Sequence, residues 1–336
     1  MLVVVTGCAG FIGSHVSERL IARGDDVIGI DSMDPYYDPA IKWRNLDEVQ
    51  AVAEASNAGR FIFREYDILG NVEQLYKLYD KPDAIIHLAA KAGVRPSIED
   101  PVSYQINNVV GTTNLLESCA RNGIKRFVFA SSSSIYGEGA AGGLEMLEWD
   151  ESVSNNPVSP YAASKRACEL IGRTYSALYD TSFTALRYFT VYGPRQRPEM
   201  AIHKFLRMAL RGEQIVLFGD PNETERDYTY IDDIVDGTIA ALDRVVPGFR
   251  AYNLGGSNPV KLGYLMDIIE VTLEKELDLV IDQRQPGDVL KTISNINRAR
   301  KELSYDPSIP IERGIELFID WIKSMKEDDR YVEEQL

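Results

Sequence analysis

The stretch Leu2-Val-Val-Val-Thr6, followed at once by Gly7-Cys-Ala-Gly10-Phe-Ile-Gly13, opens the chain and decides its fold. The apolar, β-branched run before the glycines is typical of a buried strand in a parallel sheet. The segment after the glycines has helical character. Gly7 allows a tight turn, Gly10 lets backbone N–H groups approach a pyrophosphate at the helix N-terminus, and Gly13 lets the helix pack closely on the strand. The spacing predicts a variant dinucleotide-binding loop; the alternative is a plain strand, turn and helix punctuated by glycines.

A second strand, expected at 26–31, ends in Asp31, which follows the glycine loop by roughly 20 residues. A carboxylate at this place accepts hydrogen bonds from the hydroxyls of an adenosine ribose, and it repels a ribose phosphate. Ser32, and not a basic residue, comes next. The sequence therefore predicts NAD, and not NADP, as the cofactor.

Strand-like runs and helical stretches continue to alternate through the first half of the chain. The expected strands are 60–64, 83–88, 126–130 and 183–187, and the expected helices lie near 40–56, 71–80, 104–122 and 161–179. Such alternation implies a parallel sheet with right-handed crossovers, which is the doubly wound α/β (Rossmann) fold. Ligands bind these sheets at the carboxyl ends of the strands.

After about residue 190 the pattern changes to loops rich in Gly, Pro, Arg and Asp, with short strands between helices expected at 201–211, 231–245, 262–274 and 311–326. We therefore expect a smaller, partly interleaved C-terminal substrate domain. The predicted division assigns residues 1–189, with approximately 229–255, to the NAD-binding domain. It assigns residues 190–228 and approximately 256–330 to the substrate domain.

The composition of the chain excludes several classes of function. Its 336 residues are 45% hydrophobic and 26% charged, as in a globular protein with a substantial core. The net charge of −15 argues against binding to nucleic acid or to an anionic membrane. The three cysteines are scattered, and neither they nor the three histidines have the spacing of disulfides or metal ligands. Because no signal peptide or membrane-spanning run is evident, we expect a cytoplasmic protein.

The segment Tyr161-Ala-Ala-Ser-Lys165 places a phenol and an ammonium one turn apart on one face of a helix. A cation beside a phenol favours the phenolate, so we expect the pKa of Tyr161 to fall from about 10 towards the range of a working base. Such a tyrosine can remove a proton from a sugar or alcohol hydroxyl. The pair also occurs by chance on ordinary helices, but here a strand running into Ser131-Ser-Ser-Ser-Ile-Tyr136-Gly137 precedes it.

In this order, the glycine loop, the serine run and the Tyr-x-x-x-Lys pair resemble the extended short-chain dehydrogenase/reductase family of nucleotide-sugar enzymes, over nearly the whole chain. The resemblance implies that Tyr161 is the base, that Lys165 lowers its pKa and anchors the ribose, and that Ser132 binds the reacting hydroxyl. The cofactor site that the resemblance implies consists of Gly7, Gly10, Phe11, Ile12, Gly13, Asp31, Asp67, Ile68, Ala89 and Lys91, with Tyr161 and Lys165. The substrate domain would bind a nucleotide sugar.

The serine run narrows the resemblance. Sugar dehydratases of this family carry an Asp-Glu pair where this chain has Ser133 and Ser134, and UDP-glucuronate decarboxylases usually keep the Glu. Water elimination needs an acid and a base that serines cannot supply. The segments that resemble UDP-glucuronate 4-epimerases are Tyr36-Tyr37-Asp38-Pro39 with Ile41-Lys42 and Arg44-Asn-Leu46, the run from Arg187 to Ala201, and Gln285-Pro-Gly-Asp288-Val289. Glu199, where the family usually has Asp, is a conservative departure.

The resemblance thus predicts inversion of C4 of a UDP-hexuronate. Arg197 would hold the sugar carboxylate with a charge-assisted fork, and Thr190, Ser133 and Ser134 would donate further hydrogen bonds. Arg226 matches the family arginine on the diphosphate, and Asp288 matches the residue on the uridine ribose. Without the resemblance, Arg197 could equally belong to a solvated basic loop.

Two other functions and the oligomeric state remain open at this stage. The chain could be a UDP-glucose/UDP-galactose 4-epimerase, or a cofactor-sensing binding protein, although such proteins typically lose the tyrosine or the lysine. By resemblance we expect a homodimer in which helices 104–122 and 161–179 of each subunit form a four-helix bundle. The candidate contacts are Leu115, Leu116, Cys119, Leu170, Tyr175 and Leu178, which could equally be core residues packed on the sheet.

Overall fold

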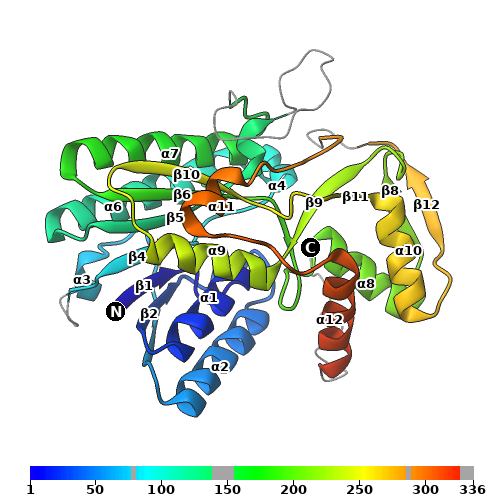
Figure 1. Ribbon diagram of the computed structural model, residues 1–336, viewed down its shortest axis with the longest axis horizontal. Helices are drawn as coiled ribbons and strands as arrows, with labels where there is room; N and C mark the ends of the chain where they lie inside the picture. The colour runs from blue at the N-terminus through cyan, green and yellow to red at the C-terminus, as the bar shows by residue number, and fades with distance from the viewer. Residues whose placement is uncertain (77–80, 138–154, 285–288, 326–336) are drawn as a thin grey trace.

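The computed structural model describes residues 1–76, 81–137, 155–284 and 289–325, and its centre is a parallel sheet of seven strands (Figure 1). The strands are β1 (Leu2–Thr6), β2 (Asp26–Asp31), β3 (Phe61–Glu65), β4 (Ala84–His87), β5 (Arg126–Ser132), β6 (Ser182–Tyr188) and β10 (Phe249–Leu254). They lie in the order β10-β6-β5-β4-β1-β2-β3, with every neighbouring pair parallel. The order reverses between β1 and β4, where doubly wound sheets bind their ligands. The predicted α/β fold is confirmed.

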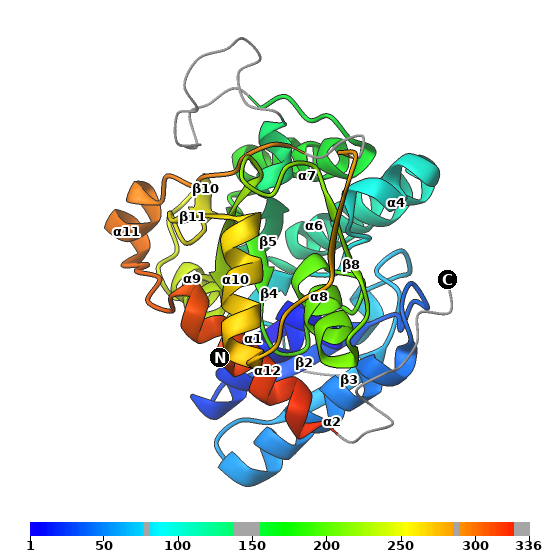
Figure 2. The same cartoon turned by 90° about the vertical axis from the view of Figure 1, so that its right-hand side faces the viewer.

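Helices cover both faces of this sheet (Figures 1 and 2). One face carries α1 (Phe11–Ala22), α2 (Pro39–Ser56) and α9 (Ile231–Asp243). The other carries α7 (Pro160–Tyr179) and a continuous helical stretch made of α5 (Pro101–Tyr104), the π-helical turn η1 (Gln105–Val110) and α6 (Gly111–Asn122). The shorter elements are α3 (Glu73–Tyr76), α4 (Val94–Glu99) and the 3-10 turn η2 (Ser133–Tyr136).

Local sequence signals begin two of the long helices. The Asp38 side chain accepts a hydrogen bond from the Ala40 N–H at the start of α2, and Ser159 accepts one from the Ala162 N–H at the start of α7. Both helices then have proline in their first turn, where its missing N–H costs nothing. The cap on α7 fixes the first turn of the helix that carries Tyr161.

After Tyr188 the chain builds a second, smaller part beside the sheet (Figure 1). Its elements are β7 (Thr190–Tyr192), α8 (Ala201–Arg211), β8 (Ile215–Phe218), β9 (Glu225–Tyr230), β11 (Pro259–Lys261), α10 (Leu262–Leu273), β12 (Leu279–Asp282), α11 (Asn297–Leu303) and α12 (Ile311–Ser324). They form a three-stranded sheet, β11-β9-β7, and a two-stranded sheet, β12-β8. The chain returns to the large sheet at β10, and α11 packs against β10 and α9.

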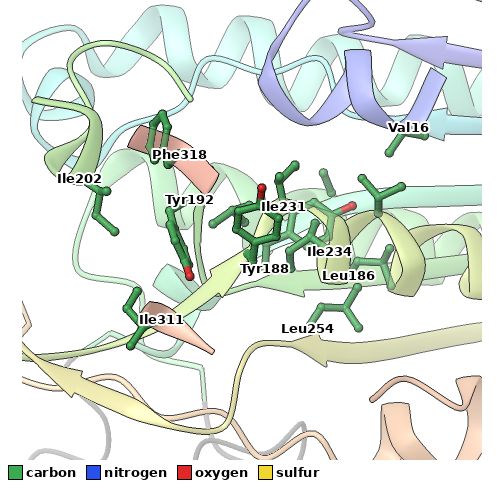
Figure 3. Close-up of a cluster of buried hydrophobic side chains, with 14 of the residues drawn as sticks. Val16, Leu186, Tyr188, Tyr192, Ile202, Ile231, Ile234, Leu254, Ile311 and Phe318 are labelled. Atoms are coloured by element: carbon green, nitrogen blue, oxygen red, sulfur yellow. The ribbon is translucent and has the colours of Figure 1, made fainter. Parts of the chain in front are cut away.

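One hydrophobic core joins the two parts (Figure 3). Val16 of α1 and Ile231 of α9 belong to the same buried cluster as Ile202 of α8 and Phe318 of α12. The loop after β6 therefore leaves the large sheet through a packed interior, which holds Thr190 and the residues after it over the carboxyl ends of the strands.

Three expectations from the sequence need correction. Of the expected helix 71–80, the described part is only Glu73–Tyr76, and residues 77–80 lie outside the described residues. Helices α4 and α11 were not expected, because six and seven residues are too few to show a helical period. Leu115, Leu116 and Cys119 are each 0% exposed against the sheet, so they are core residues and not interface contacts.

Candidate active site

A cavity of about 470 Å³ at the carboxyl ends of the strands brings most of the predicted site together. The predicted residues that line it are Gly7, Gly10, Phe11, Ile12, Gly13, Asp31, Asp67, Ile68, Ala89, Lys91, Ser132, Ser133, Ser134, Tyr161, Lys165, Thr190 and Arg197. Arg226 does not line it, and Asp288 lies outside the described residues. Residues separated by nearly 200 positions meet here because strand ends of both parts share this edge.

The glycine loop leaves the N-terminus of α1 open to the cavity. Gly10 is the N-cap residue, no side chain caps the helix, and its first turn has no acidic residue. A Cβ on Gly13 would lie 2.0 Å from the Gly7 carbonyl oxygen, and one on Gly7, whose φ is +73°, would lie 2.8 Å from the Ala89 nitrogen. These contacts require glycine, and the open helix end with its uncompensated N–H groups fits the diphosphate of a dinucleotide.

Asp31 lies at the end of β2 in the wall of the same cavity. Its carboxylate accepts a hydrogen bond from the Met33 N–H at 2.9 Å and forms an ion pair with the Lys42 ammonium at 3.3 Å. A carboxylate held in this way fits the hydroxyl pair of a ribose. The contact of Lys42 with Asp31 was not predicted, because a separation of 11 residues gives no local signal for it.

The catalytic candidates meet where β5 ends beside the first turns of α7. The hydroxyls of Tyr161 and Ser132 interact in the same cavity wall, and the Ser132 Oγ donates a hydrogen bond to the Ser134 Oγ at 3.1 Å. Lys165, one turn further along α7, donates from its ammonium to the Ala130 carbonyl at 2.8 Å, 4.8 Å from the centre of the Phe129 ring. A phenol, a hydroxyl and a buried ammonium are therefore within reach of one reacting group.

The pKa expected for Tyr161 is corrected by this geometry. Burial raises the pKa of Tyr161, and the interaction with the Ser132 side chain and the charge of Arg197 lower it only in part. Burial also lowers the pKa of Lys165 to about 8. The prediction that Lys165 depresses the pKa of Tyr161 is wrong for this arrangement, because the ammonium is directed at the Ala130 carbonyl and the phenol is desolvated.

A buried ion pair supports the strand that carries Ser132. Glu169, one turn after Lys165, accepts a hydrogen bond from the Ser131 Oγ at 2.7 Å and pairs with Arg187 of β6 at 2.9 Å. Arg187 also donates to the Tyr136 hydroxyl at 2.8 Å. All of these groups are buried, so each polar atom depends on its partner. No local spacing in the sequence indicates this network, because its members come from separate elements of the chain.

Asn108, in the π-helical turn, connects the cofactor wall to α7. Its side-chain oxygen accepts from the Lys91 N–H at 2.8 Å, and its amide nitrogen donates to the Lys91 carbonyl and to the Ser164 Oγ, each at 2.9 Å. The π turn directs this buried side chain towards both neighbours, as such turns often do at functional sites. Nothing in the helical pattern of 104–122 indicated the extra residue in the turn.

At the sugar end of the cavity, Arg197 is held among Glu199, Met200 and Tyr36. Its Nε forms an ion pair with the Glu199 Oε1 at 3.0 Å, and its Nη2 lies 3.4 Å from the Met200 sulfur. Its guanidinium carbon lies 5.4 Å from the centre of the Tyr36 ring. Thr190, Ser133 and Ser134 line the same cavity, so this end offers a cation and several hydroxyls to an anionic group.

Arg226 has a different environment. It lies on β9, and its Nη1 donates to the carbonyls of Glu225 at 2.9 Å and Leu290 at 3.0 Å. The second bond ties β9 to the segment that follows residues 285–288. A role for Arg226 and Asp288 in holding the nucleotide stays a prediction.

The sequence profile of the NAD dependent epimerase/dehydratase family matches residues 3–255. The chain belongs to this family. Its resemblance to nucleotide-sugar epimerases is thereby confirmed, and NAD is the cofactor of this epimerase-family member.

Individual members of the family are similar along their whole length. A UDP-glucuronate 4-epimerase of Thermodesulfobacterium geofontis is 39% identical over 323 residues, which cover 95% of each chain. The solved UDP-glucuronic acid 4-epimerase of Bacillus cereus, in complex with UDP-glucuronic acid and NAD, is 34% identical with a TM-score of 0.86, covering 96% of this chain and 99% of that one. The solved UDP-glucose 4-epimerase of Thermotoga maritima, with UDP-glucose, is 30% identical with a TM-score of 0.85, over the same shares.

None of the helices in the described ranges combines the length and the apolar character that a membrane span requires.

Proposed function

We propose that this protein is a UDP-glucuronate 4-epimerase, which interconverts UDP-glucuronate and UDP-galacturonate by inverting C4. One observation carries the proposal: the candidate catalytic base Tyr161 and its neighbour Ser132 line the same cavity as Arg197. Three residues with hydroxyl groups also line this cavity, namely Thr190, Ser133 and Ser134. A cation within a ring of hydroxyl donors suits the C6 carboxylate of a uronate. A neutral hydroxymethyl group at C6 would form no ion pair with this cation.

In the proposed reaction Tyr161 accepts the proton of the sugar 4-hydroxyl while Ser132 hydrogen bonds to that oxygen. NAD, which the glycine loop and Asp31 would hold, would supply the reversible hydride chemistry at C4, with removal from one face of the ring and return to the other. The 4-keto sugar turns between these steps, with the nucleotide held by the smaller part of the protein. Tyr161 then returns the proton to the new 4-hydroxyl, so the protein positions the sugar and moves one proton in each direction.

The direct test is product analysis with purified protein and either UDP-glucuronate or UDP-glucose. We expect UDP-galacturonate from the first and little or no UDP-galactose from the second. Rapid inversion of UDP-glucose, with UDP-glucuronate unchanged, would instead establish the alternative, a UDP-glucose/UDP-galactose 4-epimerase. Turnover of neither sugar would favour a cofactor-binding protein.

Arg197 is predicted to protect the intermediate as well as to bind it. The 4-keto uronate is a β-keto acid: if its C5–C6 bond breaks, CO₂ leaves, the electron pair passes to the enolate of the 4-ketone, and C5 then takes a proton. Return of the hydride to that 4-keto pentose gives a UDP-pentose. We propose that Arg197 holds the carboxylate out of alignment with the ketone, which prevents this loss.

Arg197→Ala should therefore raise the KM for UDP-glucuronate about 10- to 100-fold, the worth of a charge-assisted hydrogen bond, and increase the proportion of UDP-pentose. Chromatography of the products with mass detection measures both. Arg173→Ala, an exposed arginine of α7 outside the cavity, is the matched control and should behave as wild type. Unchanged KM and unchanged product ratio in Arg197→Ala would exclude the assignment.

The pH dependence of the reaction follows from the two buried groups. In the reactive form Tyr161 is ionised and Lys165 is protonated. A second form, with a neutral Lys165 and a protonated Tyr161, carries the same number of protons, so the ratio of the two forms does not change with pH. Because the pKa of Lys165 is lowered to about 8 and that of Tyr161 is raised, these two forms taken together become the main population only above about pH 8. We expect kcat/KM for UDP-glucuronate to rise between pH 6 and pH 8; a flat or falling profile would contradict this.

We further propose a homodimer, in which a second copy covers an apolar stripe on α5 and η1. Val102, Ile106 and Val110 recur every four residues and are 65%, 47% and 47% exposed. On the adjacent α7, Leu170 and Leu178 are also exposed. Ile106→Glu should convert a dimer into a monomer in light scattering after gel filtration, and a monomeric wild type would refute the proposal.

We also place the enzyme in the cytoplasm. All three cysteines, Cys8, Cys119 and Cys168, are buried free thiols, a usage that suits a reducing compartment.

A further inference from the structure

We propose that Tyr36 is the positioning residue that gives this site its preference for a uronate, because it fixes Arg197 at a set place relative to Tyr161. The inference rests on the proposed function, since it concerns how that site recognises its substrate. Tyr36 lies in the loop after β2, in the NAD-binding part of the chain, whereas Arg197 lies in the loop after β7.

The ring of Tyr36 contacts the guanidinium of Arg197. The guanidinium carbon lies 5.4 Å from the centre of the ring, within the range of a cation–π interaction. Glu199 engages Nε, and the Met200 sulfur lies beside Nη2. The ring thus limits the tilt of a guanidinium that is already held along one edge, and a planar fork needs this restraint to bind a carboxylate.

Tyr36 is itself held in place at its hydroxyl. Its hydroxyl interacts with that of Tyr104, which donates a hydrogen bond to the Ala92 carbonyl at 2.9 Å. Gly93 leaves little space there, because a Cβ would lie 3.2 Å from the Tyr36 hydroxyl, at a φ of +111°. The phenol of Tyr36 is therefore fixed at its far end as well as at its face.

Tyr104 in turn contacts Tyr161, the candidate catalytic base. The Tyr104 ring, only 2% exposed, stands edge-on to the Tyr161 ring, with 6.3 Å between centres and 81° between planes. Contacts therefore run from Arg197 through Tyr36 and Tyr104 to Tyr161. Two rigid rings set the separation between the cation that would hold C6 and the phenol that would act at C4, and small errors in such a separation cost much of the rate.

The test is a series of variants at Tyr36 assayed with UDP-glucuronate, and with UDP as a ligand that lacks a carboxylate. Tyr36→Leu, which removes the ring, should raise the KM for UDP-glucuronate about tenfold and increase the UDP-pentose proportion, while the Kd of UDP changes less than about twofold. Tyr36→Phe keeps the ring and loses only the hydroxyl at its far end, so it should raise this KM less than Tyr36→Leu does. Trp43→Leu removes a 45% exposed aromatic side chain from α2 outside the cavity, and should change none of these values.

Two results would overturn the inference. One is a Tyr36→Leu enzyme with wild-type KM and product ratio. The other is an equal loss of affinity for UDP-glucuronate and UDP, which would mean that Tyr36 only fills space. Thermal melting of each variant identifies losses caused by unfolding, and in that case Tyr36→Met, which also lacks an aromatic face, replaces leucine in the comparison. If wild-type protein does not turn over UDP-glucuronate at all, the proposed function fails, and this inference fails with it.

Discussion

Tyr161→Phe is expected to lower kcat for the inversion of UDP-glucuronate by about 10²- to 10⁴-fold, the usual contribution of a positioned acid–base group. The change removes only the hydroxyl that interacts with Ser132 and leaves the ring in the cavity wall. The KM should change little, because the nucleotide and the carboxylate are held by other residues. Single-turnover measurement of NADH formation and steady-state product analysis would both detect the loss.

A matched control for this variant lies on the same helix. Tyr175 of α7 donates a hydrogen bond to Glu117 at 2.9 Å and does not line the cavity. Tyr175→Phe also removes one hydroxyl and should keep wild-type activity. If Tyr161→Phe retained more than a tenth of the wild-type kcat, another group would have to be the base, and the mechanism proposed here would be wrong.

Lys165→Met should have opposite effects on activity and stability. In the folded protein the pKa of Lys165 is about 8, below the 10.5 of the free side chain. The unfolded chain therefore binds more protons between these values, so burial of this lysine costs stability below about pH 8 and the cost falls as the pH rises to 10.5. At pH 7 the shift corresponds to about 3 kcal/mol. Methionine removes this cost, and we expect the Tm at pH 7 to rise by a few degrees.

The same substitution should lower kcat by about 10²- to 10⁴-fold, because the family resemblance implies that Lys165 anchors the cofactor ribose and thereby positions the reacting groups. Calorimetry at pH 7 and at pH 10 tests the stability effect, which should be larger at pH 7. Lys301→Met, on the exposed surface of α11, should leave both Tm and kcat unchanged. A lower Tm for Lys165→Met at pH 7 would show that its bond to the Ala130 carbonyl contributes more than the desolvation of the ammonium costs.

The helix at 104–122 shows what an apolar sequence pattern cannot determine. The expected helix 104–122 exists, but its apolar residues occur on two sides. Leu115 and Leu116 face the sheet, whereas Ile106 and Val110 face outwards. An amphipathic period reports that an apolar side exists, and it does not say what covers it. The π-helical turn inside this stretch shifts the period further, and no local signal marks it.

The sequence by itself determined the parallel sheet, the glycine loop, Asp31 and the pair of Tyr161 with Lys165. These features are local: a strand, its turn and the next helix are adjacent in the chain, and two residues four apart share one face of a helix, so spacing alone places them. Only the tertiary structure decided the raised pKa of Tyr161, the ion pair of Lys42 with Asp31 and the contact of Tyr36 with Arg197. Desolvation and contacts between distant loops depend on how the chain packs, which spacing does not encode.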